Sequence, residues 1–163
     1  MDRLKQISER LVQGLSILPG VHFCGMMPKR RDDIRLPAIL LTVAELEPGQ
    51  DPGTGELALV AHWEARLVVS DHMAELDGWA MVQTVLYWLF DQRFPEANIG
   101  RAQIKQASPD HFSPDYLGHQ VWLIEWTQTL RVGEDVWQGD GVIPTTLSVG
   151  GLSPERKDLE VAA

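Results

Sequence analysis

Apolar and polar positions alternate most regularly between residues 57 and 70. Every second residue there is apolar, in the order Leu57, Leu59, Ala61, Trp63, Ala65, Leu67 and Val69, and the residues between them include His62, Glu64, Arg66 and Ser70. A period of two over this length predicts a strand with one buried face. A second apolar run at 36–46 comes before it, separated by a loop rich in proline and glycine. The two runs together predict a long β-hairpin.

Two segments have the three- and four-residue spacing of amphipathic helices. The first spans residues 3–18, with Leu4, Ile7, Leu11, Leu15 and Leu18 on one face, and ends at Pro19-Gly20. The second spans about 72–90, with Ser70-Asp71 as its expected N-cap and a buried face made by Leu76, Trp79, Val82, Leu86 and Leu89. Its last turns, 85–90, are apolar nearly all round. That end is therefore expected to contact more than one sheet face or another subunit.

Further strands are predicted at 21–27, 101–108 and 119–132. The first half of the last run is apolar on both faces, which indicates a central strand. Beyond Gly133, many turn-forming residues alternate with scattered apolar ones. This composition predicts an extended arm that makes its hydrophobic contact elsewhere, for example on another chain. The prediction is an α+β fold with a mainly antiparallel sheet, a long β-hairpin and two packed helices, with one domain at 1–132 and the arm at 133–163.

Charge and cysteine content narrow the class of protein. The formal net charge of −9 argues against general binding to nucleic acid phosphates or recognition of their sequence. The basic triplet Lys29, Arg30 and Arg31 is the one candidate for a local basic patch; it either contacts an acidic partner or is a solvated loop neutralised by its neighbours. A single cysteine, Cys24, excludes an intramolecular disulfide and fits a reducing cytoplasm. No apolar stretch approaches the roughly 20 residues of a membrane span, so no membrane contact is expected.

The best candidate for chemistry is His62-Trp63-Glu64, because residues two apart on a strand share a face. With His72 or Asp71 this pair could supply metal ligands; the alternative is the polar outer face of a half-buried strand. Cys24 is interpreted as a small core residue rather than a nucleophile. No His-Glu-x-x-His, Gly-x-Ser-x-Gly or Walker pattern occurs. We therefore expect no enzymatic activity, no catalytic or metal site and no cofactor.

Candidate contacts with partners lie in the loop at 48–56 and in the arm. Nine residues are more than a hairpin requires, so the loop either orders against a neighbour, with Gln50, Asp51 and Thr54 as contacts, or is a tolerated insertion. Five of the six tryptophans fall on faces predicted to be buried, namely Trp63, Trp79, Trp88, Trp122 and Trp126. Trp137 lies in the arm, and aromatic anchors of that kind are enriched at interfaces. Trp137, Ile143 and Leu147 are thus further candidates for subunit contacts.

The order of elements resembles the tail terminator proteins of long-tailed bacteriophages. The resemblance covers about residues 1–132 and rests on element order, length and acidic composition: an N-terminal amphipathic helix, Leu36-Pro37-Ala38-Ile39 opening a long hairpin, a helix with Trp-Leu-Phe, and a final strand pair. It implies a small α+β subunit that forms a homohexameric ring on the tail tube, stops tube polymerisation and docks to the head connector.

The partners that the resemblance implies are other copies of the chain, the tail tube protein and a neck protein. The implied location is the virion, with assembly in the host cytoplasm. Two alternatives stay open, namely another head–tail joining or tail-completion protein, and a small-molecule enzyme or ligand-binding domain.

Overall fold

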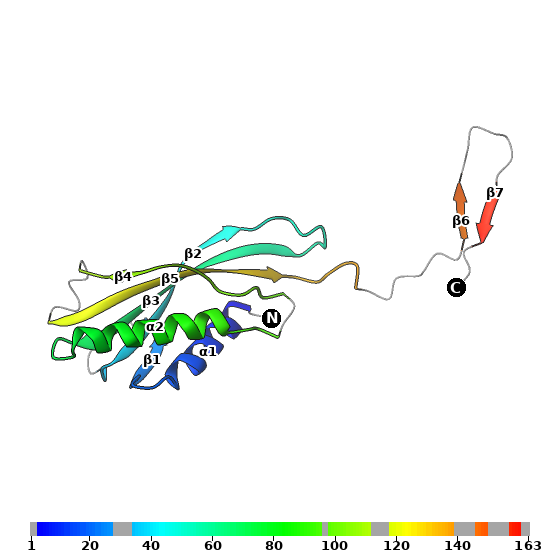
Figure 1. Cartoon of the computed structure of the whole chain (residues 1–163). Helices are drawn as coiled ribbons and strands as arrows, with labels where there is room; N and C mark the ends of the chain where they lie inside the picture. Colours follow the sequence, from blue (N-terminus) through cyan, green and yellow to red (C-terminus); the bar gives the residue numbers. More distant parts are fainter. Residues whose placement is uncertain are drawn as a thin grey trace.

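The chain folds as an α+β protein, as predicted (Figure 1). The computed structural model describes residues 3–27, 34–95, 98–111, 118–138, 146–149 and 157–160. The elements of the main body are α1 (Arg3–Ser16), β1 (Phe23–Met26), β2 (Ala38–Pro48), β3 (Leu57–Ser70), α2 (Glu75–Asp91), β4 (Gln103–Pro109) and β5 (His119–Val132). In the arm, β6 (Thr146–Val149) and β7 (Lys157–Glu160) pair antiparallel with each other.

The sheet of the main body has five strands in the order β1-β2-β3-β5-β4. The predicted hairpin is present, and β3 pairs antiparallel with β2 on one side and along its whole length with β5 on the other. β4 adds to β5 antiparallel, so β5 is an interior strand, as the two apolar faces of its first half indicated. β1 runs parallel to β2 at the opposite edge, a pairing that the sequence pattern left open.

Both helices pack on the same face of the sheet, which they cover with one continuous core (Figure 1). α1 lies over β1 and β2 and contributes Ile7, Leu11 and Leu15, as its spacing predicted. In the middle of the sheet the rings of Trp63 and Trp126 stack with their centroids 6.1 Å apart. These tryptophans are directly opposite in the β3–β5 register, so pairing of the two strands places one ring on the other. No helix in the described part of the chain is long and apolar enough to cross a bilayer.

The two helices touch each other through Gly14 of α1 and Trp88 of α2. A Cβ at position 14 would overlap the Trp88 indole ring, so only glycine allows α1 to come this close. The guanidinium of Arg10 also lies over the ring of Phe94, 5.7 Å from its centroid. The helix pair is therefore held by side chains at one seam as well as by the sheet beneath it.

The predicted start of the second helix was wrong by three residues. α2 begins at Glu75, with Ala74 as an N-cap that makes no side-chain hydrogen bond. The Ser70 hydroxyl accepts a hydrogen bond from the backbone N–H of His72, and the Met73 N–H donates to the Ser70 carbonyl. Ser70 is thus used to close a turn at the end of β3, which competes with its role as a helix cap.

The predicted buried face of α2 was also partly wrong. Leu76 is 71% exposed and Trp79 is 48% exposed. The buried residues are Gly78, Val82, Val85 and Leu89, which recur at four- and three-residue steps. Apolar residues occupy two stripes of this helix, so the sequence pattern did not show which stripe meets the sheet. The apolar last turns are not enclosed by the described residues, since Tyr87 and Phe90 are 69% and 68% exposed.

Candidate functional site

The loop at 48–56 and Trp137, which the sequence presented as separate candidates, lie against each other. The indole Nε1 of Trp137 donates a hydrogen bond to the carbonyl of Gly53 at 2.9 Å. The backbone N–H of Val136 donates to the carbonyl of Thr54, also at 2.9 Å. We call this surface, residues 48–56 together with 134–138, the hairpin-end cluster. It joins the tip of the β2–β3 hairpin to the chain that leaves β5.

The loop itself is ordered by short-range contacts. The carboxylate of Asp51 accepts a hydrogen bond from the Gly53 N–H at 2.8 Å, which closes a local turn. Gly53 and Gly55 both have positive φ angles, 70° and 80°. At Gly55 a Cβ would also lie only 2.9 Å from Cγ1 of Val136. Glycine is therefore required there twice, for its backbone conformation and for the close approach of the arm.

A buried carboxylate fixes the base of the loop. The Glu56 side chain is only 2% exposed and accepts three hydrogen bonds: from Thr54 Oγ1 at 2.9 Å, from Asn98 Nδ2 at 2.8 Å and from Arg131 Nη1 at 3.2 Å. The backbone N–H of Arg131 in turn donates to the carbonyl of Asn98. Three separate segments are thus tied to one charge, which is satisfied on both of its oxygens.

The hairpin-end cluster presents apolar side chains to solvent. Within it Trp137 is 77% exposed and Val136 66%, and on the adjoining ends of β3 and β2 Leu57 is 57% exposed and Leu46 44%. Large apolar residues gathered at one end of a molecule, with an aromatic among them, are typical of protein interaction surfaces. The arrangement can bind a partner through these side chains while the Glu56 network holds their backbone in place.

The other residues predicted to contact partners lie in different parts of the chain. Gln50 and Asp51 are exposed in the loop and Thr54 is half-buried, so these three belong to the hairpin-end cluster. Leu147 lies in β6, opposite Leu159 of β7. The basic triplet at 29–31 and Ile143 lie outside the described residues.

His62 and Glu64 line one small hollow, as their shared strand face predicted, but their side chains approach different charged residues. The Nε2 atom of His62 lies 3.2 Å from a carboxylate oxygen of Glu47, without hydrogen-bond geometry. Glu64 instead pairs with Arg66 at 2.9 Å, and Arg66 also reaches Asp110 at 3.2 Å. Within the described ranges, no three His, Cys, Asp or Glu side chains converge as a metal site would require. The geometry fits the polar outer face of a half-buried strand.

The lone cysteine is in an apolar setting. Cys24 packs against the edge of the main core, and burial raises the pKa of its thiol to about 12. Desolvation disfavours the thiolate, which is the nucleophilic form. The Cys24 thiol therefore stays protonated at neutral pH.

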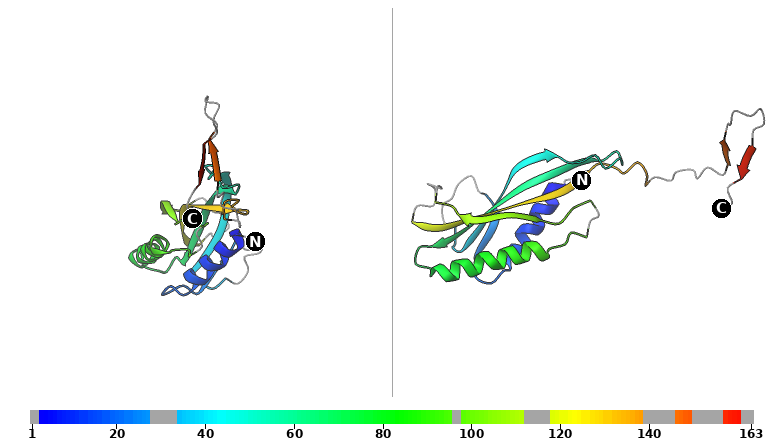
Figure 2. Two further views of the ribbon diagram at one scale, coloured as in Figure 1. Left: turned by 90° about the vertical axis from the view of Figure 1, so that its right-hand side faces the viewer. Right: turned by 45° about the horizontal axis from the view of Figure 1, so that its top comes forward.

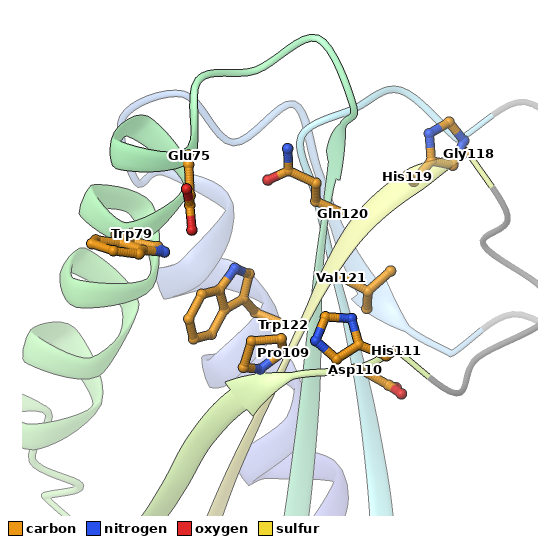
Figure 3. Close-up of a pocket in the computed structure, with 10 residues that line it drawn as sticks. All are labelled: Glu75, Trp79, Pro109, Asp110, His111, Gly118, His119, Gln120, Val121 and Trp122. Carbon is orange, nitrogen blue, oxygen red and sulfur yellow. The ribbon is translucent and has the colours of Figure 1, made fainter.

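A shallow hollow of about 460 Å³ lies between α2 and the ends of β4 and β5 (Figure 3). Glu75 and Trp79 of α2 face Trp122 of β5 across it, and His111 and His119 lie at separate points on the strand side. The carboxylate of Asp110 in its wall is already engaged by Arg66. The hollow mixes acidic and aromatic side chains but brings no pair of them into hydrogen-bonding contact in the described residues.

Sequence reasoning missed Glu56, Asn98 and Arg131. Glu56 stands in a turn-rich loop, a context in which a charged residue is expected to be solvated. Its partners Asn98 and Arg131 are 42 and 75 residues away along the chain, and no local pattern connects them.

Comparison with known proteins gives no independent indication of family, since no protein-family model and no curated sequence matches this chain.

Proposed function

We propose that this chain is a structural phage tail protein, a tail terminator whose copies form a ring on the end of the tail tube. In this role it stops tube polymerisation and offers a docking surface to the head connector. The chain acts by binding, and its partners are further copies of itself, the tail tube protein and a neck protein.

The observation that carries this proposal is the hairpin-end cluster. It lies at the tip of the long β2–β3 hairpin, where Trp137 bonds to the carbonyl of Gly53 and is exposed together with its neighbour Val136. A buried carboxylate with three donors holds the loop in one conformation before any partner binds. Preorganisation of this kind reduces the entropy lost on association, which favours a contact between rigid subunits.

The proposal is tested by tube assembly in vitro. Tail tube protein encoded by the same phage or prophage is polymerised with and without this chain, and tube lengths are measured by electron microscopy. We expect tubes that carry a ring at one end and do not elongate when fresh tube protein is added. Tubes that lengthen equally in both cases would contradict the proposal.

Two matched variants test whether the hairpin-end cluster is the surface that binds the tube. Trp137→Ala is expected to weaken capping at least about tenfold, as the loss of an interface aromatic does. Ile17→Ala serves as the control, because this side chain is similarly exposed, 79%, but follows α1 outside the hairpin-end cluster. Capping that is unaffected by Trp137→Ala would remove the cluster from the tube interface. Binding to the connector without binding to the tube would favour another neck protein.

A further inference from the structure

The exposed apolar residues of α2 form one stripe. Counted from Leu76, the residues Trp79, Tyr87 and Phe90 follow after about one, three and four helical turns. The four side chains are 71%, 48%, 69% and 68% exposed. The exposed Gln83 stands at the second turn, so the stripe has one polar, uncharged position. No charged residue occurs between Gly78 and Phe90. We call these four residues the α2 flank; such a stripe on a surface helix is typical of a protein contact.

The α2 flank points away from α1. Trp88 meets Gly14 of α1, and Phe90 is two residues further along α2. Residues two apart on a helix differ in direction by about 200°, so Phe90 points to the side opposite the helix seam. α2 contacts β4, which is one edge of the sheet. The α2 flank therefore belongs to the β4 edge of the molecule, as the left view of Figure 2 shows for the helix.

The opposite edge of the molecule carries an apolar hollow. Val12 is two residues from Gly14, so it points away from α2 by the same helical geometry. Val12 lines a hollow of about 400 Å³. The other lining residues are Lys5, Ser8, Glu9 and Gln13 of α1 and Met26 of the edge strand β1. Lys5 and Glu9 approach each other at 3.9 Å, so their charges balance. We call this surface the α1 flank.

We propose that the α2 flank of one copy of this chain docks into the α1 flank of the next. The two surfaces lie at opposite edges of one sheet, so copies placed side by side in the same orientation bring them together. One is a row of exposed apolar side chains without charge, three of them aromatic, and the other is a hollow whose two charges neutralise each other. A contact between different surfaces of identical subunits is head-to-tail, and it closes into a ring when the rotation between copies is a whole fraction of a turn. The inference rests on the self-assembly in the proposed function and names its surfaces.

The test uses variants that damage one flank each. Tyr87→Glu with Phe90→Glu places charge on the α2 flank, and Met26→Glu places it in the α1 flank, where Met26 is 42% exposed. Ser8→Trp fills the same hollow without charge, as a second α1-flank variant. Thr84→Glu is the control, because Thr84 is exposed on α2 outside the stripe. Thermal unfolding of each variant shows that it is folded.

Sedimentation velocity over a concentration series measures assembly. Wild type and the control should form oligomers, and each flank variant alone should raise the dissociation constant at least about 30-fold. An equimolar mixture of an α2-flank and an α1-flank variant retains one intact contact. It should give a dimer of twice the 18.3 kDa chain mass and nothing larger.

Two results would overturn the inference. The first is wild type that stays monomeric at every concentration. The second is α1-flank variants that assemble like wild type, which would show that the α2 flank does not dock into the α1 flank and would point to pairing of two α2 flanks. The tube assay separates this failure from that of the proposed function. If the flank variants cap tubes as well as wild type does, the flank contact is refuted and the proposed function stands. If wild type forms rings that do not cap tubes, the proposed function is refuted and the flank contact stands.

Discussion

Replacing Glu56 by alanine removes the charge that ties the hairpin loop to β5 and to the segment before β4. Three donors lose their acceptor, namely Thr54, Asn98 and Arg131. Removing one member of a buried ion pair costs about 3–5 kcal/mol. Arg131 is 36% exposed and can be rehydrated, so the cost here is smaller. We expect the free energy of unfolding to fall by about 2–3 kcal/mol.

Urea unfolding followed by tryptophan fluorescence measures this loss. Glu56→Gln keeps an acceptor for Asn98 but turns a neutral amide toward Arg131, so we expect a loss of about 1–2 kcal/mol. Glu45→Ala is the matched control, since Glu45 is an exposed acid of β2; its effect should stay within about 0.5 kcal/mol. Amide exchange in the loop should also accelerate in Glu56→Ala. A loss below about 1 kcal/mol would refute the reasoning that a buried carboxylate fixes the hairpin end.

Three further predictions concern packing, thiol chemistry and the arm. Replacing glycine by alanine should change the free energy of unfolding in opposite directions in the two helices, as measured by thermal unfolding. Gly14→Ala should destabilise by about 1–3 kcal/mol, because its Cβ overlaps the Trp88 ring. Gly78→Ala should stabilise by about 0.5–1 kcal/mol, because the nearest atom to its Cβ is 3.7 Å away. Native Cys24 should react with iodoacetamide at pH 8 at least about 100-fold more slowly than in urea, because its raised pKa removes the thiolate; equal rates would contradict this. The same shift should lower stability above about pH 9, where only the unfolded thiol ionises, and leave it unchanged below. Trp137→Ala should leave the free energy of unfolding within about 0.5 kcal/mol, because the ring is 77% exposed; a larger loss in urea unfolding would show that the ring is part of the core.

Local pattern was sufficient for the elements whose burial alternates without ambiguity. β3 and β5 begin and end at the residues that their period of two indicated, and the buried residues of α1 are those of its apolar stripe. A strand between two neighbours, or a helix with one apolar stripe, leaves one arrangement that hides its apolar side chains from water. α2 has two such stripes, and only its place against the sheet shows that the stripe of Gly78, Val82, Val85 and Leu89 is the buried one.

The sequence by itself thus determined the α+β class, the hairpin, the interior place of β5 and the inner face of β3. Only the tertiary structure decided that β1 runs parallel to β2, which stripe of α2 is buried, and that Trp137 lies on the loop at 48–56. It also decided that Glu56 is buried rather than solvated, because its partners come from segments 42 and 75 residues away. The physical reason is the range of the interactions. The periodicity of apolar residues shows which side chains are buried away from water. Strand pairing, close approach and the pairing of buried charges depend instead on neighbours that only folding brings together.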